Sequence, residues 1–327
     1  METAIDLVIP WVDGSDPAWQ QEKATFTGEG DGRTIRFRDW GLLPYVFRGI
    51  EQYLPWVRQV CFVTWGHLPP WLNEQAPRLR IVRHEDYIPE AYLPTFNSHT
   101  IELNLHRLPG LAEQFIYAND DMFFLQPLTR GFFFQKGLPV DKAEETPLRF
   151  LNGDIDHIIG NDLAVINRHF SKKETLRRHW HQWFDPKLGK SAAKNVLFSN
   201  FSGVLGFFDP HLPCAYRKST FEAIWREEPD LLDATCRHRT RTIADVNQWV
   251  CRYRQLVTGE FVSDGTPRGR FFSIGKDDTS IERVIKERRC PMICLNDDDP
   301  HLDFEYEQQQ LIRWFEHILP TPSLFER

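Results

Sequence analysis

The sequence of 327 residues has no apolar run near the roughly 20 residues that a membrane-spanning helix needs. Its first residues carry no basic segment and reach Asp6 at once, so we do not expect a secretory signal. Basic residues are also few: 39 Lys and Arg stand against 46 Asp and Glu, a formal net charge of −7. This balance argues against a nucleic-acid partner but leaves room for a local phosphate site. We expect a cytoplasmic protein. Its short aromatic runs, such as residues 131–134, pack in the core or, alternatively, associate peripherally with the inner face of the membrane.

Cysteine is scarce and scattered, with six residues in the chain. Without an export signal, we expect these thiols to be reduced. Cys290 and Cys294 are separated only by the stretch PMI, and no second pair stands at metal-ligand spacing, so the pattern does not indicate a zinc site. The 41% of hydrophobic residues suffice for a sizeable core. We see no repeat and no clear linker, and we expect one domain over residues 1–327.

The first half of the chain alternates apolar strands with helical spacing. We predict strands at residues 5–12, 60–65, 79–82 and 115–118, one helix with apolar positions between Leu43 and Tyr53, and another over residues 101–108 that Ser98 caps. This alternation predicts an α/β fold, Rossmann-like, with a mostly parallel sheet flanked by helices. In such sheets ligands bind at the carboxyl ends of the strands.

The second half is less regular, and we interpret it as helical insertions and loops. The predicted segments are loops at residues 141–147, 185–195 and 263–270, a strand or strand pair at 196–208, and helices at 242–257 and 303–319.

The stretch FIYANDDMFF, residues 115–124, is apolar except for Asn119, Asp120 and Asp121. Two adjacent carboxylates at the end of a strand repel each other, and a folded protein tolerates them where water, a cation or hydrogen-bond donors sit beside them. The stretch therefore indicates either a metal-dependent active site or an acidic turn.

A second acidic turn, DGSD, follows the first strand and contains Asp13, Gly14 and Asp16. A carboxylate there can accept hydrogen bonds from the ribose or base of a nucleotide. The alternative is an Asx turn, which Gly14 also favours. Both acidic turns fall at the carboxyl edge of the predicted sheet.

Three further motifs have a functional and a purely structural interpretation. His211 lies between prolines in DPHLP, a rigid setting suited to a general base or simply a surface turn. Arg241 ends the basic run RHRTR before a predicted helix, where it binds phosphate or is solvated, and Asp245 lies one turn further on and is placed to orient it. Asn296 and Asp297 begin the cluster NDDD, which is a phosphate or metal contact or a solvated turn.

Taken together, these segments resemble the Stealth family of sugar-1-phosphate transferases. That family includes bacterial capsular polysaccharide phosphotransferases and the α/β subunit of the animal N-acetylglucosamine-1-phosphotransferase. The resemblance rests on four segments in the family's order, which begin IDLVIPWVDGSDP, RFRDWGLLPY, DPHLPCAYRKS and CLNDDD and together cover well over half of the chain. It implies a glycosyltransferase-A-like version of the predicted sheet.

The resemblance also implies a reaction. A nucleotide diphosphate sugar, typically a UDP-sugar, passes sugar-1-phosphate to a hydroxyl of a glycan acceptor, and the nucleoside monophosphate leaves. A divalent cation assists, magnesium or else manganese. Matched position by position, the implied site residues are the acidic pair Asp120 and Asp121, the neighbouring Asn119, the base His211, Arg241 with the helix acid Asp245, the nucleotide turn Asp13–Gly14–Asp16, and the polar pair Asn296 and Asp297.

The chain departs from many relatives where Leu42 and Pro44 replace a glutamate and an arginine, and where Trp65 and His67 stand in TWGH. Those positions are candidates for donor contacts, so the donor sugar of the better-known relatives cannot be assigned to this chain. Nothing resembles the large inserted modules of the animal enzyme, so a bacterial surface-glycan enzyme fits better. Two rival functions stay open: a metal-dependent glycosyltransferase that releases nucleoside diphosphate, and a non-catalytic glycan-binding protein whose acids hold calcium.

Overall fold

The computed structural model describes residues 3–27 and 38–327. Its central sheet has five strands in the order β3-β2-β1-β4-β8. The first four strands are parallel, and β8 runs antiparallel to β4 at one edge. The bounds are β1 Ile5–Trp11, β2 Val60–Thr64, β3 Leu79–Arg83, β4 Gln114–Tyr117 and β8 Cys214–Arg217. This mostly parallel sheet confirms the predicted Rossmann-like, glycosyltransferase-A-like α/β fold.

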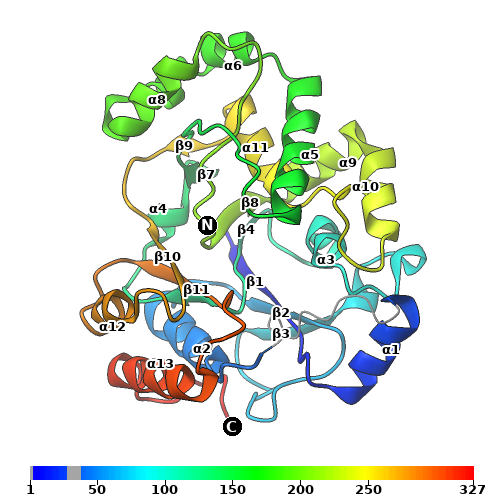
Figure 1. Cartoon of the computed structure of the whole chain (residues 1–327), viewed down its shortest axis with the longest axis vertical. Helices are drawn as coiled ribbons and strands as arrows, with labels where there is room; N and C mark the ends of the chain where they lie inside the picture. Colours follow the sequence, from blue (N-terminus) through cyan, green and yellow to red (C-terminus); the bar gives the residue numbers. More distant parts are fainter. Residues whose placement is uncertain (1–2, 28–37) are drawn as a thin grey trace.

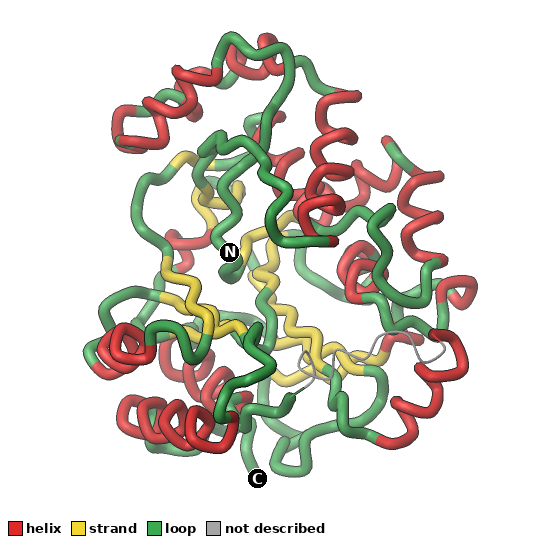
Figure 2. The backbone as a smooth tube through the Cα atoms, in the orientation of Figure 1, coloured by secondary structure: helices red, strands yellow, loops and turns green. Residues whose placement is uncertain are grey.

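Both faces of the central sheet are buried, which explains why its strands are continuous apolar runs. Alternate residues of β1 enter two different cores: Leu7 and Ile9 pack in one hydrophobic cluster, and Val8 packs in the other. Figure 2 shows helices on both sides of the strands. The first cluster takes residues from α2 (Leu43–Tyr53), α12 (Asp278–Lys286) and α13 (Phe304–Ile318). The second takes residues from α3 (Ser98–Leu103), α5 (Asp154–His169), α9 (Lys218–Glu227), α10 (Pro229–Arg237) and α11 (Trp249–Thr258).

A second sheet of three strands has the order β10-β11-β5. Its bounds are β5 Met122–Phe124, β10 Gly269–Ser273 and β11 Met292–Asn296. Strand β11 is parallel to β10 and antiparallel to β5. Strands β4 and β5 therefore belong to different sheets, and the polar residues between them mark the place where the chain leaves one sheet for the other. A third, small sheet has the order β6-β7-β9, with bounds Phe134–Gln135, Leu138–Asp141 and Val262–Ser263.

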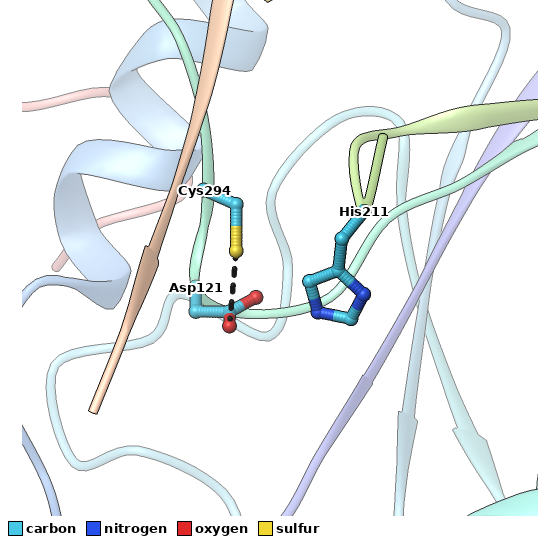
Figure 3. Close-up of side chains that lie close together, drawn as sticks. All are labelled: Asp121, His211 and Cys294. Atoms are coloured by element: carbon cyan, nitrogen blue, oxygen red, sulfur yellow. Dashed lines mark hydrogen bonds between the residues drawn. The ribbon is translucent and has the colours of Figure 1, made fainter. Parts of the chain in front are cut away.

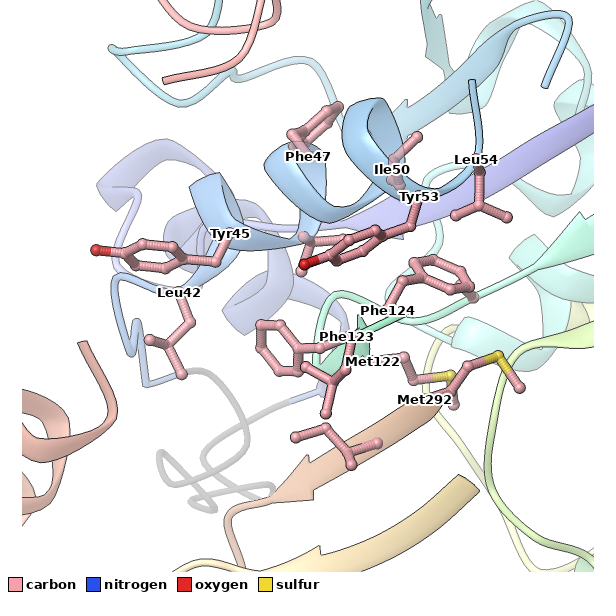
Figure 4. Close-up of a cluster of buried hydrophobic side chains, with 14 of the residues drawn as sticks. Leu42, Tyr45, Phe47, Ile50, Tyr53, Leu54, Met122, Phe123, Phe124 and Met292 are labelled. Atoms are coloured by element: carbon pink, nitrogen blue, oxygen red, sulfur yellow. The ribbon is translucent and has the colours of Figure 1, made fainter. Parts of the chain in front are cut away.

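Helix α2, Leu43–Tyr53, packs directly on the start of the second sheet. Its buried side chains, among them Phe47, Ile50 and Tyr53, share a cluster with Phe123 and Phe124 of β5 (Figure 4). The approach is close at Gly49, where an added Cβ would lie 3.0 Å from the backbone oxygen of Phe124. Strand β5 is thus held against the core directly after the acidic pair.

The remaining helices surround the sheets, and most of those in the second half gather around α5 and α11 at the top of Figure 1. The bounds are α1 Pro17–Thr27, α3 Ser98–Leu103, α4 Arg130–Phe133, α5 Asp154–His169, α6 Lys172–Arg178, α7 Trp180–Trp183, α8 Lys190–Phe198, α9 Lys218–Glu227, α10 Pro229–Arg237, α11 Trp249–Thr258, α12 Asp278–Lys286 and α13 Phe304–Ile318. Short 3₁₀ helices are His84–Asp86, Glu90–Tyr92, Leu105–Arg107 and Pro186–Leu188. In the part of the chain that the structure describes, no helix is long and apolar enough to cross a membrane.

Several predicted elements were wrong or misplaced. Residues 196–208 form the end of α8 and a loop rather than a strand, and Val196, Leu197 and Phe201 face solvent. Extended pairing is limited to the end of this loop, where Phe207 forms an isolated antiparallel bridge with Glu145. Much of the predicted loop 185–195 is helical, and the predicted loop 263–270 overlaps the ends of β9 and β10. The sequence TFTGEGDGRT predicts a polar, glycine-rich loop at residues 25–34, but residues 25–27 form the end of α1, and residues 28–34 lie outside the described residues.

Two helix starts also differ from the predictions. The cap of α3 is Asn97, whose side chain accepts a hydrogen bond from the backbone N–H of His99, and Ser98 is the first helical residue. Helix α11 begins at Trp249 rather than at residue 242. The intervening turn is held by side chains instead: Asp245 accepts the backbone N–H of Thr242, and Asp162 accepts that of Asn247.

Candidate functional site

The carboxyl ends of the central parallel strands carry the predicted polar turns. The chain leaves β1 toward Asp13, leaves β2 toward His67 and leaves β4 toward Asp120. The first two turns touch: the backbone N–H of Asp13 donates to Nε2 of His67 over 2.7 Å, and Nδ1 of His67 lies 3.7 Å from Oδ2 of Asp16. The turn after β4 follows the strand that pairs with β1. The polar residues thus share one edge of the sheet.

Within the turn after β1, the carboxylates have local structural partners. Oδ1 of Asp13 accepts from the backbone N–H and the hydroxyl of Ser15, over 2.8 and 2.6 Å. Oδ1 of Asp16 accepts from the backbone N–H of Trp19 in the first turn of α1, and the Gly14 carbonyl accepts from the side chain of Gln20. The Asx-turn interpretation is therefore correct for Asp13. Nucleotide binding by this turn stays a prediction.

Asp121 is the centre of a group of three potential metal ligands. One carboxylate oxygen, Oδ2, accepts a hydrogen bond from the Cys294 thiol over 3.3 Å. The other oxygen, Oδ1, is buried and has no hydrogen-bond partner in the described structure. The His211 ring faces the Asp121 carboxyl group (Figure 3), and the donor atoms of Asp121, His211 and Cys294 all lie within 4.8 Å of one another.

The surroundings of the acidic pair shift the pKa values of both carboxyl groups upward. Asp120 keeps an exposed surface, yet protein atoms surround its carboxyl group closely. Desolvation and the neighbouring charge of Asp121 raise its pKa to about 7. Burial also raises the pKa of Asp121, and the nearby His211 opposes this rise. A bound cation would favour the ionised form of both carboxyl groups.

Asn296 is the last residue of β11 and Asp297 follows it, and the second sheet brings this end of β11 near the acidic pair. Cys294 pairs with Met122, and the backbone N–H of Leu295 donates to the Asp121 carbonyl over 3.0 Å. This register carries Asn296 toward Asp120.

Asp297 already has partners. Its Oδ2 accepts from Nε1 of Trp40 over 3.2 Å and lies 3.5 Å from Nε of Arg38, whereas its Oδ1 is buried without a partner in the described part of the chain. Among residues 3–27 and 38–327, the group of potential metal ligands consists of Asp121, His211 and Cys294. Asp120 and Asp297 are not part of it.

Side-chain contacts with buried residues hold the loop that carries His211 in place. His211 has a φ of 47°, in the left-handed region that non-glycine residues rarely adopt. Two residues earlier, Asp209 accepts from Nη1 of Arg252 over 2.5 Å and from the Tyr253 hydroxyl. Arg252 is buried and also donates to both carboxylate oxygens of Asp141, over 2.8 and 3.0 Å. These contacts, rather than the prolines alone, fix the loop.

Arg241 and Asp245 do not act on each other as expected. The exposed Arg241 guanidinium donates from Nε and Nη2 to the Ser98 hydroxyl, over 3.1 and 2.6 Å. The described structure shows no contact between the Arg241 and Asp245 side chains, because both residues lie in a turn and not one helical turn apart. The expectation that Asp245 orients Arg241 directly was wrong.

Asp245 is instead a buried structural carboxylate. It accepts from Asn97 over 2.9 Å, from Nδ1 of His99 over 3.1 Å and from Nδ1 of His238 over 2.6 Å. Thr242 donates to it from both its backbone and its hydroxyl. Although burial alone would raise its pKa, these hydrogen bonds lower the pKa of Asp245 to about 2. The carboxylate holds the turn that carries Arg241 against the start of α3.

Sequence reasoning missed Glu102, on α3. Its Oε1 accepts from the Tyr117 hydroxyl over 3.0 Å, and its Oε2 is buried without a partner in the described structure. Tyr117 ends β4, three residues before Asp120. The only signal in the sequence is a glutamate among positions expected to face the core.

The positions where the chain departs from many relatives have different surroundings. Leu42 is buried in the first hydrophobic cluster, so it does not act as a donor contact. Trp65 donates from Nε1 to Glu22 over 2.9 Å, and His67 touches the turn after β1, so these two residues lie beside the proposed nucleotide turn.

Two family models match the chain: Stealth protein CR1, conserved region 1, over residues 3–31, and Stealth protein CR2, conserved region 2, over residues 36–141. A capsular polysaccharide phosphotransferase WcwK of Streptococcus pneumoniae is 37% identical over 332 residues, covering 100% of both chains. The exopolysaccharide phosphotransferase cps2G of Lactiplantibacillus plantarum is 36% identical, covering 99% of this chain and 96% of that protein. The receptor polysaccharide phosphotransferase WefC of Streptococcus oralis is 34% identical, covering 98% of this chain and 99% of that protein.

Among solved structures, the apo form of the bifunctional glycosyltransferase WbbM is similar over 97% of this chain and 52% of its own, with 10% identity and a TM-score of 0.42. The fold assignment rests on the strand order and register given above. Because more than a third of the residues are identical along almost the whole length of these curated relatives, and both family models match in order, the chain belongs to the Stealth family.

Proposed function

We propose that the protein is a sugar-1-phosphate transferase of bacterial capsule or surface polysaccharide synthesis, with residues 1–327 acting as one catalytic domain. The proposed donor is a nucleotide diphosphate sugar of the UDP-sugar class, and the proposed acceptor is a hydroxyl of a glycan. The relatives of matching length carry the name phosphotransferase. The observation that carries the proposal is the carboxyl group of Asp121, which lies next to Asp120 and faces His211, and whose buried Oδ1 has no partner among the residues that the structure describes.

The residues present fit a divalent cation. Carboxylate oxygens are the ligands that Mg²⁺ prefers, and Asp120 and Asp121 supply them, including the buried Oδ1 of Asp121 that has no partner in the described part of the chain. When bound, such a cation would neutralise the charge that develops on the donor phosphates. Asp297 is proposed as a further ligand through its Oδ1, which has no partner among the described residues, and Asn296 is proposed to contact the donor. Manganese has similar ligand preferences and is the alternative ion.

The reaction proceeds by attack of the acceptor oxygen on the phosphorus atom next to the sugar. The new bond joins that oxygen to phosphorus, the bond from phosphorus to the bridging oxygen of the diphosphate breaks, and the nucleoside monophosphate leaves. The acceptor proton passes to a ring nitrogen of His211, which the anchored loop holds toward Asp121. Phosphoryl transfer depends mainly on such positioning and on charge stabilisation.

Arg241 is the proposed cation for the donor phosphates. Its planar group presents forked N–H donors to an anion, and its present partner is a neutral hydroxyl, which a phosphate can displace. Asp245 contributes indirectly by holding the turn that carries Arg241. Asp13, Gly14 and Asp16, with Asn119, are proposed to line the nucleotide end.

The rival function is an ordinary glycosyltransferase, which attacks the sugar carbon and releases nucleoside diphosphate. A panel of nucleotide sugars, incubated with Mg²⁺ and a glycan pool, separates the two by the nucleotide released. Monophosphate from at least one donor supports the proposal, whereas diphosphate supports the rival. Donor binding without any turnover across the panel would favour a non-catalytic glycan-binding protein.

A further inference from the structure

The donor group around Asp121 is chemically mixed. Asp121 follows β4, Cys294 lies within β11, and His211 lies in the loop before β8, so three distant segments supply an oxygen, a sulfur and a nitrogen. Sequence spacing does not reveal this group, because the partner of Cys294 is not Cys290. Figure 3 shows the thiol and the imidazole on two sides of one carboxyl group.

The fold holds all three donors in place before any ion binds. Cys294 is fixed by its pairing with Met122, and the bond from the Leu295 N–H to the Asp121 carbonyl keeps the acid beside it. His211 is fixed by its loop, through the contact of Asp209 with Arg252. Asp121 and His211 are both partly exposed, which gives an ion access from that side.

Mg²⁺ and Ca²⁺ favour oxygen ligands, whereas a set of one carboxylate, one imidazole and one thiolate favours Zn²⁺. We infer that Asp121, His211 and Cys294 form a binding site for a thiophilic divalent cation of the Zn²⁺ type, and that its occupation blocks sugar-phosphate transfer. Three protein ligands leave a fourth position for water. The inference rests on the proposed function only for the inhibitory consequence, not for binding.

Binding replaces one set of bonds by another. The Cys294 thiol releases its proton to solvent and binds through sulfur, so its hydrogen bond to Oδ2 of Asp121 is lost, and both residues bind the ion instead. The ring nitrogen of His211 that takes the ion no longer accepts a proton from an acceptor hydroxyl. The same ion occupies Asp121, so the oxygen-liganded cation that supports transfer is displaced.

The test uses the metal-free full chain and two probes. Titration with Co²⁺ reports thiolate ligation through a near-ultraviolet charge-transfer band, and competition with a chromophoric chelator gives the Zn²⁺ affinity. We expect the band in wild type and its loss in Cys294→Ser. The Zn²⁺ affinity of Cys294→Ser should fall by at least the roughly 10–100-fold that loss of an outer partner of a metal ligand costs.

Cys290→Ser is the matched control, because the buried Cys290 thiol donates to the Met292 carbonyl and lies outside the group. It should keep both the band and the affinity. A wild type without the band, or a Cys294→Ser variant with unchanged Zn²⁺ affinity, would overturn the site.

Nucleoside monophosphate release in Mg²⁺ is measured separately with added Zn²⁺. Zn²⁺ binding to Cys294 without inhibition would overturn the regulatory consequence. Absence of any release in Mg²⁺ would instead count against the proposed function, so the two failures are distinguishable.

Discussion

The buried Arg252 forms an ion pair with the partly buried Asp209, with 2.5 Å between Nη1 and Oδ1, at the base of the loop that presents His211. The same guanidinium binds Asp141 at the end of β7, so one arginine ties the loop to the small third sheet. The position of the proposed base thus depends on a residue that makes no contact with the acidic pair in the described structure.

We predict that Arg252→Ala lowers the free energy of unfolding by about 3–5 kcal/mol, because it removes the buried cation that pairs with the two largely buried carboxylates of Asp141 and Asp209. Arg252→Lys should cost less but lower turnover with donor affinity kept, since one ammonium group cannot reproduce the planar fork that binds both acids. Urea denaturation measures the loss of stability, and steady-state turnover measured beside donor calorimetry checks the loss of turnover at unchanged donor affinity.

Lys286→Ala is the control for Arg252→Ala. The Lys286–Glu282 pair is exposed on α12 and should be worth only about 0.3–0.5 kcal/mol. Equal losses in the two alanine variants would show that the buried pair has no special role.

The pKa of Asp120, raised to about 7, predicts the pH dependence of cation binding. Below that pH the cation-free site holds a proton that the cation must displace, so Mg²⁺ affinity should fall as pH falls through 7. Calorimetric Mg²⁺ titrations from about pH 5.5 to about pH 8.5, a range that brackets this pKa, measure the change in affinity. Asp120→Asn should bind Mg²⁺ more weakly and with less pH dependence, and excess chelator should abolish turnover of the wild type.

The same pKa fixes the sign of a stability effect. In the cation-free protein, folded Asp120 holds its proton to about pH 7, whereas its ordinary pKa is 3.8. Between pH 3.8 and about pH 7 the folded state therefore binds more protons than the unfolded state, and the free energy of unfolding falls as pH rises through this range. Asp120→Asn should remove that fall. A wild-type stability that rises across the window by an amount that Asp120→Asn abolishes would contradict the assignment.

Arg241 tests whether geometry or charge binds the donor. If its fork pairs with the phosphates, neither Arg241→Ala nor Arg241→Lys should approach wild-type turnover, because lysine offers a single charged point. Steady-state turnover of the three proteins decides. A lysine variant near the wild-type rate would show that positive charge alone suffices. Ser98→Ala, which removes only the present partner of Arg241, should have a much smaller effect.

His211→Ala should lose turnover on the order of 10²–10⁴-fold, the usual worth of general-base help, while donor affinity is largely kept. Calorimetric donor binding beside single-turnover rates separates the two. If the variant binds the donor normally and turns over near the wild-type rate, another group takes the proton. Collapse of donor affinity would instead give His211 a role in phosphate binding.

The central sheet was predictable because its strands are buried on both faces. The continuous apolar runs at β1, β2 and β4 need no partner information to be recognised. By contrast, β5 finds its partner β11 far along the chain, and that pairing brings Cys294 to Asp121. The strand predicted at residues 196–208 was wrong because an apolar run was taken as buried, whereas several of its side chains are exposed.

The site divides in the same way. Asp120, Asp121 and His211 stand in short motifs, and the structure brings Asp121 and His211 together. The supporting residues Arg252 and Glu102 carry no local signal, since their contacts are tertiary. Asp245 was recognised as a site residue, but the contact predicted with Arg241 was wrong. Side-chain hydrogen bonds to Asp245 replace the first turns of the expected helix, which begins only at Trp249.

The most direct test of the account follows the phosphorus atom next to the sugar. A UDP-sugar labelled with ³²P in that phosphate is incubated with the full chain, Mg²⁺ and a glycan pool, and the products are separated. Sugar-1-phosphate transfer predicts that the label leaves with the sugar as a phosphodiester of the glycan, or as sugar phosphate if water accepts it. The released UMP is then unlabelled. Label recovered in UDP would mean attack at the sugar carbon and would contradict the account.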